Sequence, residues 1–343
     1  MRTLLAILLC LWAGFADAQS GRRVVLLSGV PGWVLRAGGV AANIDMNFAT
    51  GQYYGCSLAS CLSIVRASPK TNLLPSSPSG FAYTIFNANV LAIDSNGLLI
   101  EEARTNQLLN STAPATQTTG ALAASAQTLW VNGSGSAALT NGTATGCTGT
   151  ATNGTPVTFT PTAGTCTVTV TGSLNAFQLE AGAFGTSLIV TAGATATRAG
   201  DNVTVTGAAL AAMQAVSGTL IVSNGTIPAP ATFPELWYSS ATAKLEVSGS
   251  NTAVSIYDGG TPVTSSTALF SAPSKTGHSW NASGRSISSH GGNAVTDATA
   301  TGARAIIYVG SQTGTTRFLN TYVSRWSEFA SRISDASLKA LTQ

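Results

Sequence analysis

The chain has 343 residues, of which 8% are charged and 36 are glycine, and its formal net charge is +3. This length suffices for two or three domains with packed cores, so disorder is not expected. Low charge with many small and β-branched residues favours β-sheets over helices, and the absence of any basic run excludes nucleic acid as an expected partner.

The first segment, residues 1–19, has the layout of a secretory signal peptide. An arginine precedes an apolar run from Leu4 to Phe15, and a small-residue site ends at Ala18. The apolar run is too short to be an ordinary transmembrane helix. The alternative is a retained hydrophobic anchor that docks into a larger particle.

Residues 20–110 are expected to form an N-terminal β-rich module, within which residues 97–110 read "GLLIEEARTNQLLN". Leu98 and Ile100 alternate onto one face, and their burial would contribute about 2 kcal/mol each. The stretch "GLLI" is therefore predicted to be a buried strand. The stretch "EEARTN" is predicted to tie this module to the next one.

Two adjacent carboxylates beside an arginine have two interpretations. Catalysis requires the carboxylates to face a common space, but neighbours in an extended segment point to opposite faces. Glu102 and Arg104 lie on the same side, so the pattern favours a structural clasp between these two side chains. The same reasoning predicts that Arg104→Ala destabilises the protein more than Glu101→Gln.

Residues 111–198 are rich in Thr, Gly, Ala and Ser, yet apolar residues recur at period two in 157–159 and 168–170. Asn-Gly pairs at 141–142 and 153–154 are hairpin signals. This pattern predicts a small β-sandwich and not a disordered linker.

The cysteines after the first segment allow two disulfides, and proximity favours Cys56 with Cys61 and Cys147 with Cys166. The residues between Cys147 and Cys166 resemble a three-strand meander, whose outer strands would lie about 10 Å apart. A disulfide needs Cα atoms within about 7 Å, so this bond requires a twist or two facing sheets. Buried free thiols are the alternative.

Residues 199–343 contain several alternating runs and end in a predicted helix over 334–341. Ser334 is the expected N-cap of this helix. Leu338 and Leu341 would share its packing face.

Two motif blocks, "GLLIEEARTN" at 97–106 and "FQLEAGAFGTSLIVTAGATATRAGD" at 177–201, resemble tail-fibre and minor tail proteins of tailed phages and prophages. The last part of the chain is similar to the C-terminal concanavalin-like, or laminin-G-like, jelly roll of that family. The resemblance implies a mostly β fold: a small β-sandwich, then a jelly roll over 199–343, then a short C-terminal helix. It also implies a virion location, other virion proteins and a host surface glycan as partners, and a homo-oligomer, possibly a trimer.

Catalytic and metal-binding signals are weak. His278 and His290 stand outside any nucleophile motif, and no phosphate loop or dinucleotide motif occurs. Calcium would need clustered oxygen ligands, for which Asp258 and Asp297 are the candidates. No cofactor or metal site is predicted, and the chain is not expected to be an enzyme.

Aromatic residues offer the better functional candidates. Sugar-binding surfaces use flat aromatic faces with polar groups nearby, and Trp237, Tyr238 and Trp280 adjoin Ser-, Gly- and Asn-rich segments. A place in the sandwich core is the alternative for each of them. The leading hypothesis is a non-catalytic phage appendage that contacts host glycans. The alternatives are a secreted bacterial lectin-like adhesin and a glycan-degrading enzyme.

Overall fold

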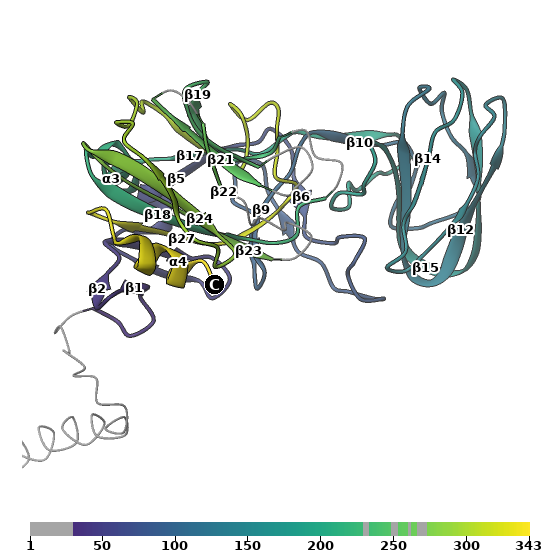
Figure 1. Ribbon diagram of the computed structural model, residues 1–343. Coiled ribbons are helices and arrows are strands. Elements are labelled where there is room, and N and C mark those ends of the chain that lie inside the picture. Colours follow the sequence, from purple (N-terminus) through teal and green to yellow (C-terminus); the bar gives the residue numbers. More distant parts are fainter. Residues whose placement is uncertain (1–29, 229–232, 248–252, 260–261, 266–272) are drawn as a thin grey trace, which may run out of the picture.

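The computed structural model describes residues 30–228, 233–247, 253–259, 262–265 and 273–343. These residues form a large two-sheet sandwich and a smaller lobe beside it (Figure 1). The protein is mostly β, as its composition predicts. The signal-like segment, residues 1–19, lies outside the described residues. Within the described residues, no helix combines the length and apolar character needed to cross a membrane.

One sheet of the large sandwich, the seven-stranded sheet, is antiparallel throughout the described residues. Its strands are, in spatial order, β22 (Val263–Ser265), β21 (Val254–Asp258), β20 (Ala243–Val247), β19 (Glu235–Ser240), β26 (Ile307–Val309), β17 (Asn202–Val205) and β5 (Leu62–Val65).

The opposite sheet, the nine-stranded sheet, is also antiparallel in the part of the chain that the structure describes. Its main path runs through β25 (Val295–Asp297), β24 (Gly284–Ser289), β23 (Ser274–Asn281), β18 (Gly218–Asn224), β27 (Thr321–Phe329), β3 (Ile44–Asn47) and β4 (Gln52–Tyr54). Two further strands, β9 (Gly97–Ile100) and β8 (Ile93–Asp94), extend it beside β27.

The core of the large sandwich lies between these two sheets. Alternate residues such as Val203, Leu245 and Val309 of the seven-stranded sheet meet Val222 and Trp326 of the nine-stranded sheet. Alternation places the intervening side chains on the outer faces. The predicted two-sheet architecture is therefore confirmed.

The N-terminal strands do not form a module of their own, which differs from the predicted boundary at residue 110. β3 pairs with the second half of β27, and β9 pairs with its first half. β5 forms the edge of the seven-stranded sheet beside β17. Residues from both ends of the chain thus complete one sandwich.

The small lobe is an insertion in this sandwich. The chain leaves through β10 (Arg104–Asn106) and returns through β16 (Ala196–Arg198), which pair antiparallel. The lobe contains β11 (Gln117–Thr118), β12 (Gln127–Asn141), β13 (Thr150–Thr152), β14 (Val157–Phe159) and β15 (Cys166–Ala181). β12 and β15 are its long central pair, and a register shift at Asn132/Gly133 bends them around the lobe's own core.

Short elements complete the described chain. The helices are α2 (Leu58–Cys61), α3 (Gly207–Gln214) and α4 (Asp335–Leu341), and the remaining strand pairs are β1 (Arg36–Ala37) with β2 (Val40–Ala41) and β6 (Lys70–Thr71) with β7 (Ile85–Phe86). α4 confirms the predicted C-terminal helix: Ser334 caps it by accepting from the Ser337 N–H, and Leu338 is fully buried.

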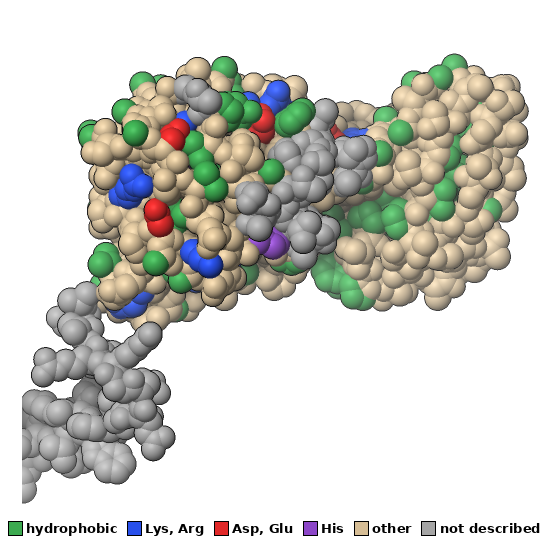
Figure 2. Space-filling view, in the orientation of Figure 1, with side chains coloured by type: hydrophobic (Ala, Val, Ile, Leu, Met, Phe, Trp, Pro, Cys, Tyr) green, Lys and Arg blue, Asp and Glu red, His purple; other side chains and the backbone are tan. Residues whose placement is uncertain are grey.

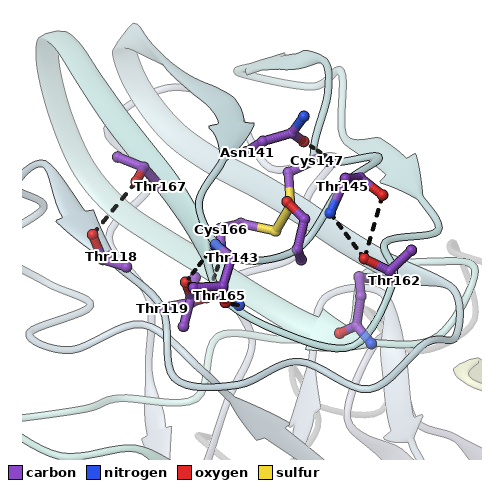
Figure 3. The surroundings of a disulfide bond; sticks show 12 residues. Thr118, Thr119, Asn141, Thr143, Thr145, Cys147, Thr162, Thr165, Cys166 and Thr167 are labelled. Atoms are coloured by element: carbon purple, nitrogen blue, oxygen red, sulfur yellow. Dashed lines mark hydrogen bonds between the residues drawn. A yellow bond between two sulfur atoms is a disulfide. The ribbon is translucent and has the colours of Figure 1, made fainter.

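Both predicted disulfides are present, with Cα–Cα distances of 6.2 Å for Cys56–Cys61 and 5.8 Å for Cys147–Cys166. The expected three-strand meander is wrong, because β13 and β14 each pair with β12. Cys147 instead lies in the loop after β12, next to the first residue of β15. Threonine pairs surround the bond, including Thr145, whose N–H donates to Thr162 Oγ1 at 2.9 Å (Figure 3).

Removing the Cys147–Cys166 bond by the double change to serine should destabilise the small lobe by about 3 kcal/mol. The bond closes a loop between residues 19 apart in sequence, and the cost of freeing a loop grows with its length. The Cys56/Cys61 double serine variant is the control, with an expected loss of about 2 kcal/mol for a separation of 5. Calorimetric unfolding measures the stability of both variants. A larger loss in the Cys56/Cys61 control would contradict the expectation that the longer loop contributes more.

The stretch "GLLI" forms the buried strand β9, as predicted. Gly97 has a φ of 126°, and a Cβ there would lie 2.4 Å from the Val323 carbonyl oxygen of β27. Leu98 and Ile100 enter the core of the large sandwich, whereas Leu99 packs on the opposite side against Tyr322. The strand therefore needs glycine at its start and apolar residues on both faces.

Five charged side chains form a buried ion network beside β9, here called the junction network: Arg66, Lys70, Glu101, Arg198 and Asp201. Each of these side chains is at most 2% exposed. Asp201 binds Arg66 Nη1 at 2.8 Å and Lys70 Nζ at 2.5 Å. Glu101 lies 3.1 Å from both Lys70 Nζ and Arg198 Nη1. The network joins the N-terminal strands, the "EEARTN" segment and the chain that follows the small lobe.

Glu101 is the central anion of this network and not a free acid. Its carboxylate accepts hydrogen bonds from the N–H and Oγ of Ser187, at 2.8 and 2.6 Å. Burial acts to raise its pKa, but Arg198, Lys70 and Ser187 outweigh burial and hold the pKa at about 2. A carboxylate held in this way is a structural anion, which agrees with the clasp interpretation of the motif.

Glu102 points the other way and binds Arg104, so the predicted clasp is present. It is the less buried part of the junction, because 32% of the Glu102 side chain and 11% of the Arg104 side chain are exposed. From these exposures we expect Glu101→Gln to destabilise the protein more than Arg104→Ala, which is the opposite order to the one that the sequence predicts. Sequence alternation identified the two faces but not which of them is buried.

Candidate functional site

A row of tyrosines crosses the outer face of the seven-stranded sheet. Trp237, Leu245 and Ile256 point into the core, so their neighbours Tyr238, Lys244 and Tyr257 point outward. Cross-strand register places Tyr257 beside Lys244, Lys244 beside Tyr238, and Tyr238 beside Tyr308. These four residues, from β21, β20, β19 and β26, are called the tyrosine row.

The row has the geometry of an aromatic platform. The rings of Tyr238 and Tyr308 lie 6.4 Å apart at an interplanar angle of 47°. Lys244 Nζ lies 4.5 Å from the centre of the Tyr257 ring. All three tyrosines are partly exposed, and four adjacent strands span about 14 Å. This length suits an extended ligand that crosses several strands.

Charged side chains next to the row form a second ion network. Lys244 and Arg317 each contact both Glu235 and Glu246. Burial raises the pKa of Glu235 to about 8, with the charge of Glu246 adding to it and Lys244 and Arg317 opposing. Both carboxylates are buried and share the same cations, so neither is a free acid or base beside the tyrosines.

The structure separates the three predicted sugar-binding residues. Tyr238 is partly exposed, but Trp237 and Trp280 are buried, at 0% and 1%, so the prediction of exposure is wrong for both tryptophans. Trp237 precedes Tyr238 on one strand, and consecutive strand residues face opposite sides. Trp280 Nε1 donates to the Ala215 carbonyl at 2.9 Å.

Sequence reasoning missed Tyr257 and Tyr308 as members of the site. Tyr257 follows the inward-facing Ile256, and Tyr308 stands between the inward-facing Ile307 and Val309. That alternation indicates an outward side chain. It does not indicate that β26 lies beside the strand of Tyr238 and β21 two strands away on its other side, because strand partners and register are not visible in a single strand.

The histidines do not form a catalytic centre. His278 is fully buried, with ring-centre distances of 6.1 Å to Trp237 and 4.9 Å to Trp280. Burial, reinforced by Arg304 and Arg285, lowers the pKa of His278 well below its usual value, so it is neutral. His290 lies in the turn after β24 with a φ of 49°.

The two aspartates considered for calcium are occupied by arginines. Asp258 binds Arg304, and Asp297 binds Arg285 through Nε and Nη2 at 3.0 and 2.9 Å. Among the residues that the structure describes, no group of three or more His, Cys, Asp and Glu side chains could hold a metal ion.

No family model matches the sequence, and no curated protein matches it. Among solved structures, the chain is similar to the CBM40 domain of the Ruminococcus gnavus IT-sialidase bound to alpha2,6 sialyllactose, with 12% identity, coverage of 39% of this chain and 87% of that chain, and a TM-score of 0.31. It is also similar to the leech intramolecular trans-sialidase (13% identity, 39% and 24% coverage, TM-score 0.31). A third similar structure is the binding domain of botulinum neurotoxin DC in complex with SialylT (12% identity, 42% and 39% coverage, TM-score 0.32).

Proposed function

We propose that this protein is a non-catalytic glycan-binding component of a phage virion, of the tail-fibre or minor tail class. The observation that carries glycan binding is the tyrosine row. Partly exposed tyrosine rings in this row offer flat apolar faces, and each ring carries a hydroxyl group that can hydrogen-bond a sugar. Aromatic faces with a few polar groups are the usual means of sugar recognition.

A binding role fits this face better than a hydrolytic one. Hydrolysis of a glycosidic bond needs an acid and a second carboxylate that both reach the bond. Glu235 and Glu246 are enclosed by Lys244 and Arg317, and Glu101 is enclosed by the junction network. These carboxylates hold the fold together, so the proposal assigns them no step in catalysis.

Alanine at all three tyrosines should weaken glycan binding about 100-fold, since each ring contributes about 1 kcal/mol, or roughly fivefold. The probes are dextran, starch, galactomannan and mixed-linkage β-glucan in affinity electrophoresis, with 6′-sialyllactose measured by calorimetry. Phenylalanine at the same positions should keep most of the affinity, because the ring faces remain. Leu109→Ala, an exposed position on the small lobe, is the control.

Equal binding by the triple alanine variant and the wild type would reject the tyrosine row as the site. Release of reducing ends from any probe, at a rate that depends on Glu235 or Glu246, would favour the enzyme alternative instead.

The virion assignment rests on the motif resemblance and needs its own test. Mass spectrometry of purified virions should find the chain with Met1 intact and accompanied by other virion proteins. A secreted form that begins at Gln19 would favour the lectin-like adhesin. We also propose a homo-oligomer, with a trimer as the first expectation, because several weak sugar contacts gain avidity together. A stable monomer in light scattering at micromolar concentration would contradict it.

A further inference from the structure

A cleft of about 720 Å³ lies between the small lobe and the large sandwich, at the hollowed waist between the two lobes in Figure 2. One wall comes from the small lobe and includes Thr158 and Phe184. The opposite wall comes from the large sandwich and includes Asn320 and Tyr322. The segment that carries Ser76 and Phe81 lines it as well. The cleft is distinct from the tyrosine row, because no member of the row lines it.

The cleft walls present hydroxyl, amide and aromatic groups without a free charge. Glu101 is the one charged residue among the described lining residues, and its carboxylate is already bound by Ser187, Lys70 and Arg198. The small lobe extends this neutrality, because residues 105–179 contain no Asp, Glu, Lys, Arg or His. Figure 2 accordingly shows no charged side chain on the visible face of the small lobe.

An uncharged site selects an uncharged ligand. A carboxylate, sulfate or ammonium group would lose its hydration in this cleft without gaining an opposite charge. A neutral polyhydroxylated ligand exchanges its water hydrogen bonds for those of the amides and hydroxyls on the walls. Its apolar C–H face has Phe81 and Phe184 available, of which Phe81 is 36% exposed.

A second, independent observation concerns the wall of the cleft. Trp130 is fully buried, and its Nε1 has no hydrogen-bond partner within the described residues. It lies against Gly185, a lining residue at which a Cβ would come within 3.2 Å of this nitrogen and 2.7 Å of Cδ1. Glycine at position 185 therefore lets the cleft wall pack directly against the edge of the Trp130 ring, and any larger residue there would disturb that wall.

We propose that this cleft is a second binding site, specific for a neutral oligosaccharide. The inference rests on the proposed function for its ligand class, but its location is independent of the tyrosine row. One chain then carries two sugar sites, which act together on a polysaccharide that reaches both. The cleft discriminates against sialylated, sulfated and uronic-acid glycans.

The test uses the full chain, with maltohexaose, cellohexaose and mannohexaose as neutral probes and oligogalacturonate and 6′-sialyllactose as acidic probes. Calorimetry should give two sites per chain for at least one neutral probe, with little change in cleft affinity between 0.1 and 1 M NaCl. Ser76→Trp should weaken the cleft site at least tenfold, because Ser76 is exposed and lines the cleft. Ser79→Trp is the matched control: Ser79 is exposed three residues later but does not line the cleft, and binding should be unchanged.

The two proposals fail in distinguishable ways. Binding that Ser76→Trp weakens and the triple tyrosine variant leaves intact supports the cleft and rejects the tyrosine row. Binding that depends on the tyrosines alone, with Ser76→Trp equal to Ser79→Trp, overturns the cleft proposal. Preference of the cleft for an acidic probe, or failure of every neutral probe to bind there, also overturns it. Phe81→Ala tests the same site by removing a contact, whereas Ser76→Trp blocks the cleft, and it should also weaken binding there. Melting curves confirm that each variant folds.

Discussion

Replacing Asp201 with asparagine should lower the free energy of unfolding by about 3–5 kcal/mol, because two buried cations lose their shared anion. Asp201 is fully buried and accepts hydrogen bonds from Arg66, from Lys70 and from the N–H of Glu101. Asparagine keeps the shape of the side chain but has no charge, and its amide group cannot accept where a carboxylate oxygen did. Urea unfolding followed by tryptophan fluorescence measures the loss.

Glu102→Gln is the matched control, because Glu102 is a partly exposed acid in the same segment. Its removal should cost no more than about 1 kcal/mol, as for other ion pairs that are open to solvent. Glu101→Gln should resemble Asp201→Asn, and Arg104→Ala should fall between the two groups. Equal losses in the Asp201 and Glu102 variants would show that the junction network does not stabilise the fold as proposed.

The junction shows what alternation can and cannot predict. The Glu102–Arg104 pair lies two residues apart on one face of an extended segment, so sequence spacing is enough to find it. The partners of Glu101 come from distant segments, and its backbone N–H bonds Asp201, which is 100 residues away. Nothing local marks Lys70 as buried, because lysine is usually exposed. The direction of Glu101 was predictable, but its environment was not.

The tyrosine row was partly predictable for the same reason. β21 and β26 alternate clearly, so the outward direction of Tyr257 and Tyr308 follows from sequence, whereas β19 carries Leu236 and Trp237 side by side in the core and does not alternate before Tyr238. Their assembly into one row depends on strand order and register, which arise from tertiary pairing. The tryptophans failed as candidates because neighbouring polar residues suggested exposure, whereas Trp237 lies one residue out of phase with Tyr238.

The domain boundaries required the topology. β27 has nine residues and needs partners along its whole free edge, which β3 and β9 provide in two halves. Sequence patterns identify such strands but not the distant segments that pair with them. The boundary expected at residue 110 therefore lies close to the β10–β16 pair, through which the chain leaves the sandwich for the inserted lobe and returns.

Glu328 should make the protein less stable as the pH rises from 4.5 to 8. Its carboxyl group lies in the core of the large sandwich, where Trp326 Nε1 donates to one oxygen and the other has no partner among the described residues. Burial raises its pKa to about 8, although Trp326 and Arg304 oppose the shift. The folded protein therefore holds a protonated Glu328, whereas the unfolded chain ionises near pH 4.5.

The pKa of Glu328 is higher in the folded protein than in the unfolded chain, so protonated Glu328 stabilises the fold fully below pH 4.5. This stabilisation is lost as the pH rises through 8, by about 4–5 kcal/mol in total. Glutamine at position 328 keeps an acceptor for Trp326 but does not titrate. Wild type should thus lose about 4–5 kcal/mol more of its free energy of unfolding than Glu328→Gln between pH 4.5 and 8 in urea unfolding.

His278 is buried and neutral, so it lowers the stability as the pH falls below 6.5. This effect is common to both proteins and cancels in the comparison. Asp335→Asn changes an exposed side chain, so its free energy of unfolding should vary with pH as that of wild type does. The same pH dependence in Glu328→Gln and wild type would mean that Glu328 is ionised in the folded core.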